Sequence, residues 1–68
     1  MTTVSTYKLL NVTVNYYINL IEDSLLRSKK ERALHFYYSI LNLVKLYYNN
    51  KYITYDAYSY FRNRIMQI

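Results

Sequence analysis

Few side chains in this 68-residue sequence have the types and spacing that acid–base chemistry requires. Glu22 and Asp23 are consecutive, so on a helix they point about 100° apart and cannot act as a carboxylate pair. Glu31, His35 and Ser39 follow one another at single helical turns, and the first two could touch. No nucleophile–base–orienter arrangement accompanies them, so we interpret them as a solvated helix surface. We therefore predict that the protein is not an enzyme.

Metal and phosphate chemistry are disfavoured by composition. The chain has one histidine and four scattered carboxylates, and it has neither cysteine nor glycine. A zinc site needs a cluster of His, Cys or carboxylate ligands, and a phosphate-binding loop needs glycine. We predict no metal and no cofactor.

The basic residues indicate recognition of nucleic acid or of an acidic protein surface. Nine Lys and Arg residues against four Asp and Glu give a formal net charge of +5 and a pI near 9.5. A weaker interpretation also stays open, because charges gather at wet turns and keep an apolar oligomer soluble. The candidate binding residues form one group at a predicted turn and one near the C-terminus: Arg27, Lys29, Lys30 and Arg32, then Arg62 and Arg64.

Tyrosine occurs 11 times, which is unusual in so short a chain. Some tyrosines fall on helical apolar patterns and are predicted to be core or interface rings. Others are predicted to be contact residues, because exposed rings add area at small entropic cost and can also stack on single-stranded bases. The first group is Tyr17, Tyr37, Tyr48 and Tyr58; the second is Tyr16, Tyr38, Tyr47, Tyr52, Tyr55 and Tyr60.

The stretch 33–48 is the element that must position these residues. Two adjacent apolar series run through it at steps of three and four, so apolar side chains cover more than half of the predicted helix. Such a helix needs partners on two sides, and we predict that one of them is another copy of the chain. The predicted oligomer or partner interface consists of Phe36, Ile40, Leu43, Tyr47, Tyr37 and Tyr48.

The first helix is predicted over about 4–26, from apolar residues that recur at helical steps. Residues 8–14 also alternate between polar and apolar side chains, as in the strand of ribbon-helix-helix repressors, and this alternative stays open. Ser28 and Glu31 match a capping box, which predicts a second helix over 29–49. One uninterrupted helix over 4–48 is a further open alternative, because neither Gly nor Pro interrupts that stretch.

A third helix is predicted over 54–67. Asn49 and Asn50 stand where a glycine usually ends a helix, and Asn tolerates the left-handed conformation better than most residues. Thr54 is the predicted N-cap, and Asp56 suits the positive end of the helix.

The predicted fold is a single all-α domain over 1–68, an antiparallel helical hairpin with a shorter third helix. A chain of this length buries only about 60% of its unfolded surface, so we expect homo-oligomerisation, with a dimer favoured, to complete a helical bundle. No apolar run approaches the roughly 18 residues that span a bilayer, and the N-terminus lacks the pattern of a secretion signal. We predict no membrane span and a cytoplasmic location, in the host cell if the protein is viral.

The predicted function is that of a small interaction or adaptor protein. Heavy use of Ile, Asn, Lys and Tyr, which have A/T-rich codons, indicates a virus or mobile element as the source. We predict that the protein presents a Tyr-rich basic helical surface to a host protein and inhibits or redirects a host complex. The alternatives are a basic nucleic-acid-binding regulator that acts through the six residues above and a structural virion subunit.

Overall fold

The computed structural model describes residues 3–68, with side chains from Thr6 onward, and this part of the chain forms three helices. They are α1 (Thr3–Leu26), α2 (Lys30–Asn49) and α3 (Tyr55–Met66), so the predicted all-helical class is confirmed. The strand over residues 8–14 and the single helix over 4–48, the two alternatives left open by the sequence, are both wrong. Residues 8–14 lie inside α1, and the chain leaves the helical conformation between α1 and α2.

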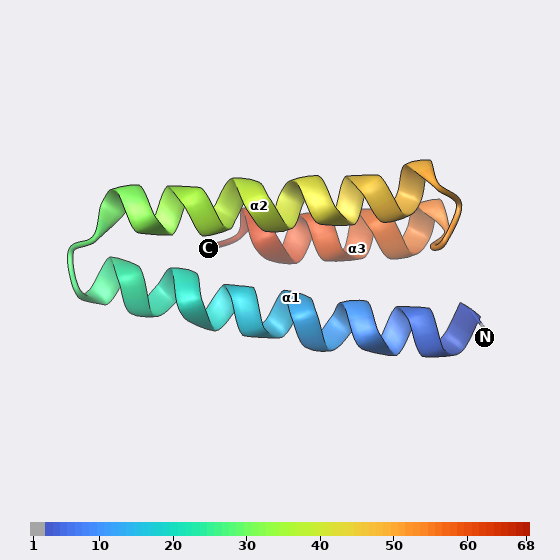
Figure 1. The fold of residues 1–68 in the computed structure, drawn as a ribbon, viewed down its shortest axis with the longest axis horizontal. Coiled ribbons are helices and arrows are strands. Elements are labelled where there is room, and N and C mark those ends of the chain that lie inside the picture. Colours follow the sequence, from blue (N-terminus) through green and yellow to red (C-terminus); the bar gives the residue numbers. More distant parts are fainter. Residues whose placement is uncertain (1–2) are drawn as a thin grey trace.

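The three helices lie side by side and differ in length (Figure 1). Figure 1 shows α2 returning alongside α1, and α3 running back behind α2 from the second turn. At 1.5 Å per residue, α1 is about 36 Å long, α2 about 30 Å and α3 about 18 Å. Only the part of the molecule next to the second turn therefore has three helices. We call it the three-helix half, and the part next to the first turn the hairpin end.

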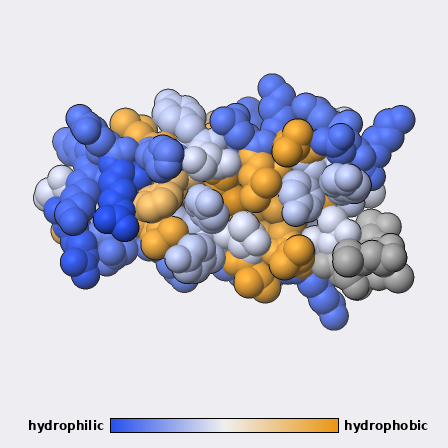
Figure 2. Space-filling model, viewed as in Figure 1, coloured by the Kyte–Doolittle hydropathy of each residue, from blue (hydrophilic) through white to orange (hydrophobic). Residues whose placement is uncertain are grey.

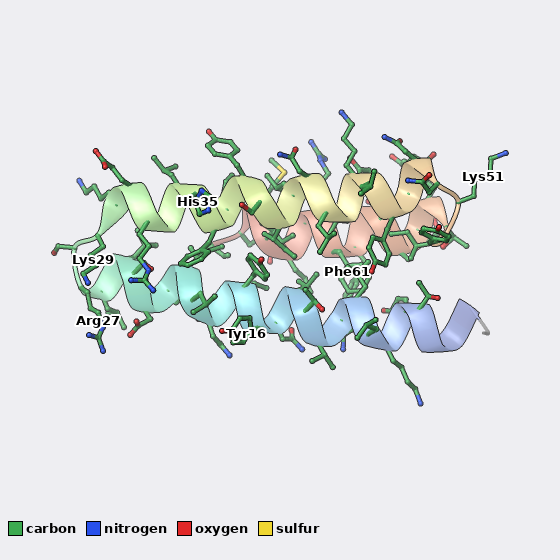
Figure 3. All side chains as sticks on the ribbon, in the orientation of Figure 1. Tyr16, Arg27, Lys29, His35, Lys51 and Phe61 are labelled. Atoms are coloured by element: carbon green, nitrogen blue, oxygen red, sulfur yellow. The ribbon has the colours of Figure 1, made fainter. Side chains whose placement is uncertain are left out.

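The core of the three-helix half is formed by apolar residues that recur at helical spacing. Leu10 and Val14 from α1 are buried between Ile40 and Val44 of α2 and the seam of α3, in which Phe61 and Ile65 are fully buried. Figure 3 shows Phe61 between the helices, and its ring centroid lies 5.2 Å from that of Tyr7. The buried residues thus follow the helical periodicity of the apolar residues in all three helices.

The turn between α1 and α2 ends α1 with a Schellman motif. Ser28 has a left-handed φ of 60°, and its N–H donates to the carbonyl of Leu25 (3.0 Å). The Lys29 N–H donates to the backbone carbonyl of Ser24 (2.8 Å). The predicted capping box is wrong. Lys29 is the N-cap of α2 and no side chain caps it, because Ser28 is already committed to the end of α1.

The second turn repeats this motif one residue later than predicted. Lys51, rather than Asn49 or Asn50, adopts the left-handed conformation, with φ of 63°. The Lys51 N–H donates to the carbonyl of Tyr48 (3.0 Å), and the Tyr52 N–H donates to the carbonyl of Tyr47 (2.9 Å). Asn50 stays near helical geometry, and its side-chain amide donates to the carbonyl of Leu46.

The start of α3 follows the prediction. Thr54 is in an extended conformation, and its hydroxyl oxygen accepts a hydrogen bond from the Ala57 N–H (3.2 Å). Asp56 lies in the first turn and Arg64 in the last, so both charges complement the helix dipole.

Candidate interaction surfaces

The structure divides the six predicted interface residues among three environments. Ile40 is 0% exposed, so its side chain is not available to a second molecule and the prediction is wrong for this residue. The half-buried Tyr48 stacks on Tyr58 of α3 with ring centroids 4.8 Å apart, because α3 packs on the second apolar side of α2 within the same chain. Tyr37 lines a groove at the hairpin end. The other three residues, Phe36, Leu43 and Tyr47, are half-buried.

These three residues belong to a two-helix surface that we call the front face. On α1 it consists of a stripe at steps of three and four, and three of its members are strongly exposed: Leu9 59%, Val12 65% and Tyr16 62%. On α2 the neighbouring stripe includes Leu46, which is 54% exposed. The front face comprises Leu9, Val12, Tyr16 and Leu20 of α1, Phe36, Leu43, Leu46 and Tyr47 of α2, and Tyr52.

Side-chain contacts join the two stripes. The Tyr17 ring lies edge-on to Phe36 with centroids 6.0 Å apart, and Tyr16 packs against Tyr17 at 6.1 Å. At the other end, Leu9, Tyr47 and Tyr52 line one shallow cleft together with Thr6. Figure 2 views the molecule from the side opposite α3 and shows hydrophobic residues along the middle of this surface, with hydrophilic residues at both ends.

The middle of the front face carries no charge. The sequence from Leu9 to Leu20 contains no charged residue, and the stretch 36–47 contains only Lys45. Lys45 follows Leu43 by two positions, which places it about 160° around the helix from that side chain. Charged residues lie toward both ends of the front face: Lys8 precedes Leu9 and Lys51 precedes Tyr52, and near the hairpin end the Arg32 guanidinium lies 5.5 Å from the centroid of the Phe36 ring. A protein partner could therefore dock on the middle without desolvating an ion.

The second apolar surface is a groove at the hairpin end, which we call the end groove. It lies between α1 and α2 where α3 stops, and it encloses about 320 Å³. Lys30 is its one charged lining residue, while Leu25 and Leu34 are 46% and 52% exposed. The remaining lining residues are Ile21, Ala33, Tyr37 and Ile68.

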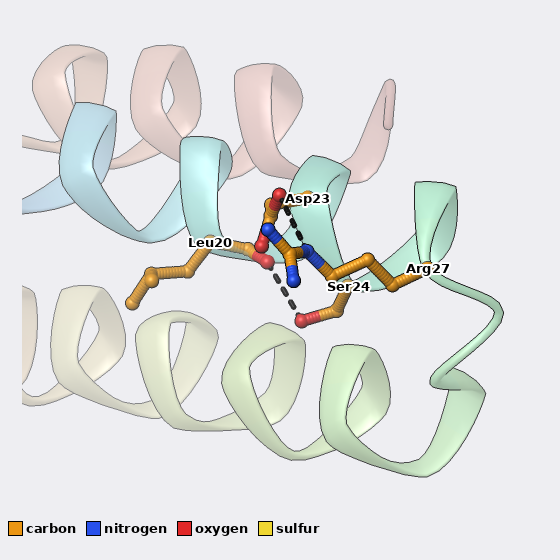
Figure 4. Close-up of polar contacts among 4 residues, drawn as sticks. All are labelled: Leu20, Asp23, Ser24 and Arg27. Atoms are coloured by element: carbon orange, nitrogen blue, oxygen red, sulfur yellow. Dashed lines mark hydrogen bonds and ion pairs between the residues drawn. The ribbon is translucent and has the colours of Figure 1, made fainter.

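The basic residues at the first turn are exposed but largely balanced by acidic neighbours. Figure 4 shows Arg27 paired with Asp23, with 3.2 Å between Nε and the carboxylate, beside the hydrogen bond from the Ser24 hydroxyl to the Leu20 carbonyl. Glu22 and Glu31 belong to the same segment, so residues 22–32 carry four basic and three acidic side chains. Most of the net charge of +5 therefore lies elsewhere.

The other two predicted basic residues are separated from this turn. Arg64 donates through its guanidinium to the side-chain oxygen of Asn15 (2.6 Å) and also lies 5.7 Å from the centroid of the Tyr60 ring. Arg64 thus links α3 to α1, whereas Arg62 is exposed. Asn15 precedes Arg27 by 12 residues, or about 18 Å along α1, so the two groups do not form one continuous patch.

The residues considered for acid–base chemistry stay on the surface. Glu31 and His35 are both exposed on α2, and the His35 ring lies beside Phe36 with centroids 5.8 Å apart. Within residues 3–68, no three His, Asp or Glu side chains come together as a metal site would require. None of the helices in the described part of the chain combines the length and hydrophobicity needed to cross a bilayer.

The sequence interpretation missed the contribution of α1 to the front face. The signal was present, because Leu9, Val12, Tyr16 and Leu20 recur at steps of three and four. This stripe lies on another side of the helix from the core residues Leu10 and Val14, and only the core pattern was used to predict the helix. Comparison of the chain with protein-family models, with curated proteins and with solved structures finds no match.

Proposed function

We propose that the protein is a non-enzymatic interaction module, encoded by a virus or mobile element, that acts in the host cytoplasm. It binds another protein and thereby inhibits or redirects a host complex. The observation that carries this proposal is the front face, a two-helix surface with exposed Leu, Val and Tyr side chains and no charge along its middle. Depletion of charge together with enrichment in aromatic residues is characteristic of the centre of protein–protein interfaces.

The exposed tyrosines support the same role. Tyr16, Tyr38, Tyr52 and Tyr55 are each 57% to 62% exposed, and each ring packs against a neighbouring ring within 6.1 Å. Rings held in place by neighbours lose little further freedom on binding, so they add contact area at low entropic cost. These rings are distributed over all three helices and the second turn, which gives a partner more than one way to approach.

A pull-down from lysate of the native host tests this proposal. The bait carries its tag before α1, the lysate is treated with nuclease, and the retained proteins are identified by mass spectrometry. We expect a host protein that is retained after nuclease treatment and lost when Tyr16 and Tyr52 are both changed to Ser. A bait that retains no protein except its own copies would refute the proposed function.

Nucleic-acid binding is the second candidate, and the exposure of the first turn favours it. Lys29, Lys30 and Arg32 are all exposed, and the pairing of Arg27 with Asp23 is a surface contact that phosphate could replace. Binding to labelled duplex and single strands should then fall steeply with salt, with a slope set by the number of phosphates contacted. The double variant Lys29→Glu/Lys30→Glu should abolish binding. No binding by the unmodified protein at low salt would exclude this candidate.

A further inference from the structure

We infer that the front face is covered by a second copy of this chain, in a symmetric dimer whose centre contains α1 and α2 of both copies. This inference rests on the proposed function in taking the front face as an interaction surface. It assigns that face to a second copy, which leaves exposed tyrosines outside it, Tyr38 and Tyr55, for a host protein. The dimer would be a four-helix bundle in which the α1–α2 hairpins of the two copies pack face to face. One α3 would pack on each outer side, since α3 lies on the side of the hairpin opposite the front face (Figure 1). Both copies of α3 then stay clear of the interface.

The size of the front face lies at the lower end of what a dimer needs. The Cα atoms of the whole described chain extend over 39 × 17 Å in the two longest directions. A flat contact over that entire side would cover roughly 650 Å², below the ~800 Å² per partner of a standard interface, and the front face is only part of that side, so the side chains of the two copies must interdigitate to bury more area. A small domain that buries little surface by itself gains from such a contact, because the exposed Leu, Val and Tyr side chains then leave water.

The charge distribution favours a second copy over an acidic partner. Two molecules that each carry a net charge of +5 repel one another, so they can associate only through a surface that keeps their charges apart. The middle of the front face does so, because the neighbouring charges lie toward its two ends and Lys45 lies about 160° around the helix from Leu43. An acidic partner would instead be matched by basic residues across the surface, and residues 9–20 contain none.

An uncharged apolar surface also meets the requirement of two-fold symmetry. In a symmetric dimer the same patch packs on itself, so any charge near the axis would meet its own copy. Thr13, which lies beside the α1 stripe, does not need an external partner, since its hydroxyl donates to the Leu9 carbonyl of its own helix (2.9 Å). Its methyl group is then free to pack.

A matched pair of leucines on α2 tests the inference. Leu46 is on the front face and is 54% exposed, whereas Leu34 lines the end groove and is 52% exposed. The variants Leu46→Lys and Leu34→Lys therefore introduce the same charge at the same helix and exposure, on different surfaces. The purified proteins are compared by sedimentation velocity and light scattering over a range of concentrations, with circular dichroism as the check on folding.

We expect the unmodified protein to be a dimer at micromolar concentration. Leu46→Lys should raise the dissociation constant by about 100-fold or more, because dimer formation would bury an unpaired ammonium, whereas Leu34→Lys should leave it within about threefold. If Leu46→Lys fails to fold, Val12→Lys on α1 tests the same surface. Its side chain is 65% exposed, so folding of the single chain does not require its burial.

Two results would overturn the inference. One is an unmodified protein that stays monomeric at 100 times that concentration, and the other is a dimer that Leu34→Lys dissociates while the front-face variants do not. The proposed function has a separate readout. A monomer that retains a host protein disproves only the dimer, and a dimer that retains no host protein disproves only the interaction with the host.

Discussion

The three-helix half and the hairpin end contain the same two long helices, yet only one of them has a closed core. In the three-helix half, Leu10, Val14, Ile40 and Val44 are at most 1% exposed because α3 covers them with Phe61. At the hairpin end, α1 and α2 have only each other, and Leu25 and Leu34 remain exposed in the end groove. The extent of the core is therefore set by the length of α3.

The hairpin end compensates with small side chains. Its buried residues are Ile21, Ser24 and Ala33, which are 2%, 3% and 4% exposed, so the two that lie nearest to the turn are small. Ser24 satisfies its hydroxyl on the Leu20 carbonyl of its own helix, which makes a polar residue tolerable at that position. Apolar residues are thus buried by a third helix in the three-helix half, whereas at the hairpin end the buried positions next to the turn hold small residues.

The largest expected effect tests whether stability resides in the three-helix half. Phe61→Ala should lower the free energy of unfolding by about 3–5 kcal/mol, because it leaves a cavity under α3, and Leu25→Ala in the end groove by less than about 1 kcal/mol. Urea unfolding should be followed at one fixed protein concentration, since association would add to stability. Equal losses for the two variants would show that the halves do not differ as described.

The contact between α3 and α1 in the three-helix half is tested next. Arg64→Ala removes the hydrogen bond to Asn15 and a longer one to Asn11 (3.4 Å), and it should lower the free energy of unfolding by about 1–2 kcal/mol. Arg62 is an exposed neighbour of the same charge, and Arg62→Ala should change stability by less than about 0.5 kcal/mol. Thermal unfolding at low and high salt separates the two, because only loss of the hydrogen bond is expected to persist in salt. A larger effect at Arg62 would contradict this assignment.

The two helix starts give a smaller contrast. Thr54→Ala removes the side-chain cap of α3 and should cost about 1 kcal/mol. Ser28→Ala should cost little by comparison, because the Ser28 side chain caps no helix. Chemical denaturation of both variants against the unmodified protein measures the difference, and an equal loss at Ser28 would restore the capping box.

The smallest effect should be the same at both turns. Ser28→Gly and Lys51→Gly each replace a left-handed residue that has a side chain, and each should raise the free energy of unfolding by about 0.5–1 kcal/mol. Asn50→Gly is the matched control. Asn50 has a φ of −89° and its side chain donates to Leu46, so this variant should lose stability.

Much of the fold follows from residue spacing. The apolar residues recur at helical steps, which located three helices to within a few residues, and Thr54 marked the start of α3. What spacing cannot supply is the identity of the neighbour. It showed that α2 is apolar on two sides, but Ile40 is buried within the chain and Tyr48 stacks on Tyr58 of α3, whereas a second molecule had been expected there.

The turns and the surfaces were less predictable for a related reason. Without glycine, the left-handed positions fell on Ser28 and Lys51, which are neither the residue type nor the positions that local preference suggests. The hydrogen bonds of the chain reversal outweigh that preference. The front face depends on two helices that are distant in sequence, so neither stripe alone was strong enough to identify it.

The early end of α3 also decides where the molecule can be labelled. Ile68 lines the end groove, so a fluorophore or affinity tag attached after it would emerge at the mouth of that groove and obstruct it. The start of α1 lies at the other end of the molecule, near the second turn and far from the first turn (Figure 1). A dye placed there and a second dye at the first turn would be separated by roughly the 36 Å of α1, a convenient distance for energy-transfer measurements on single and paired chains.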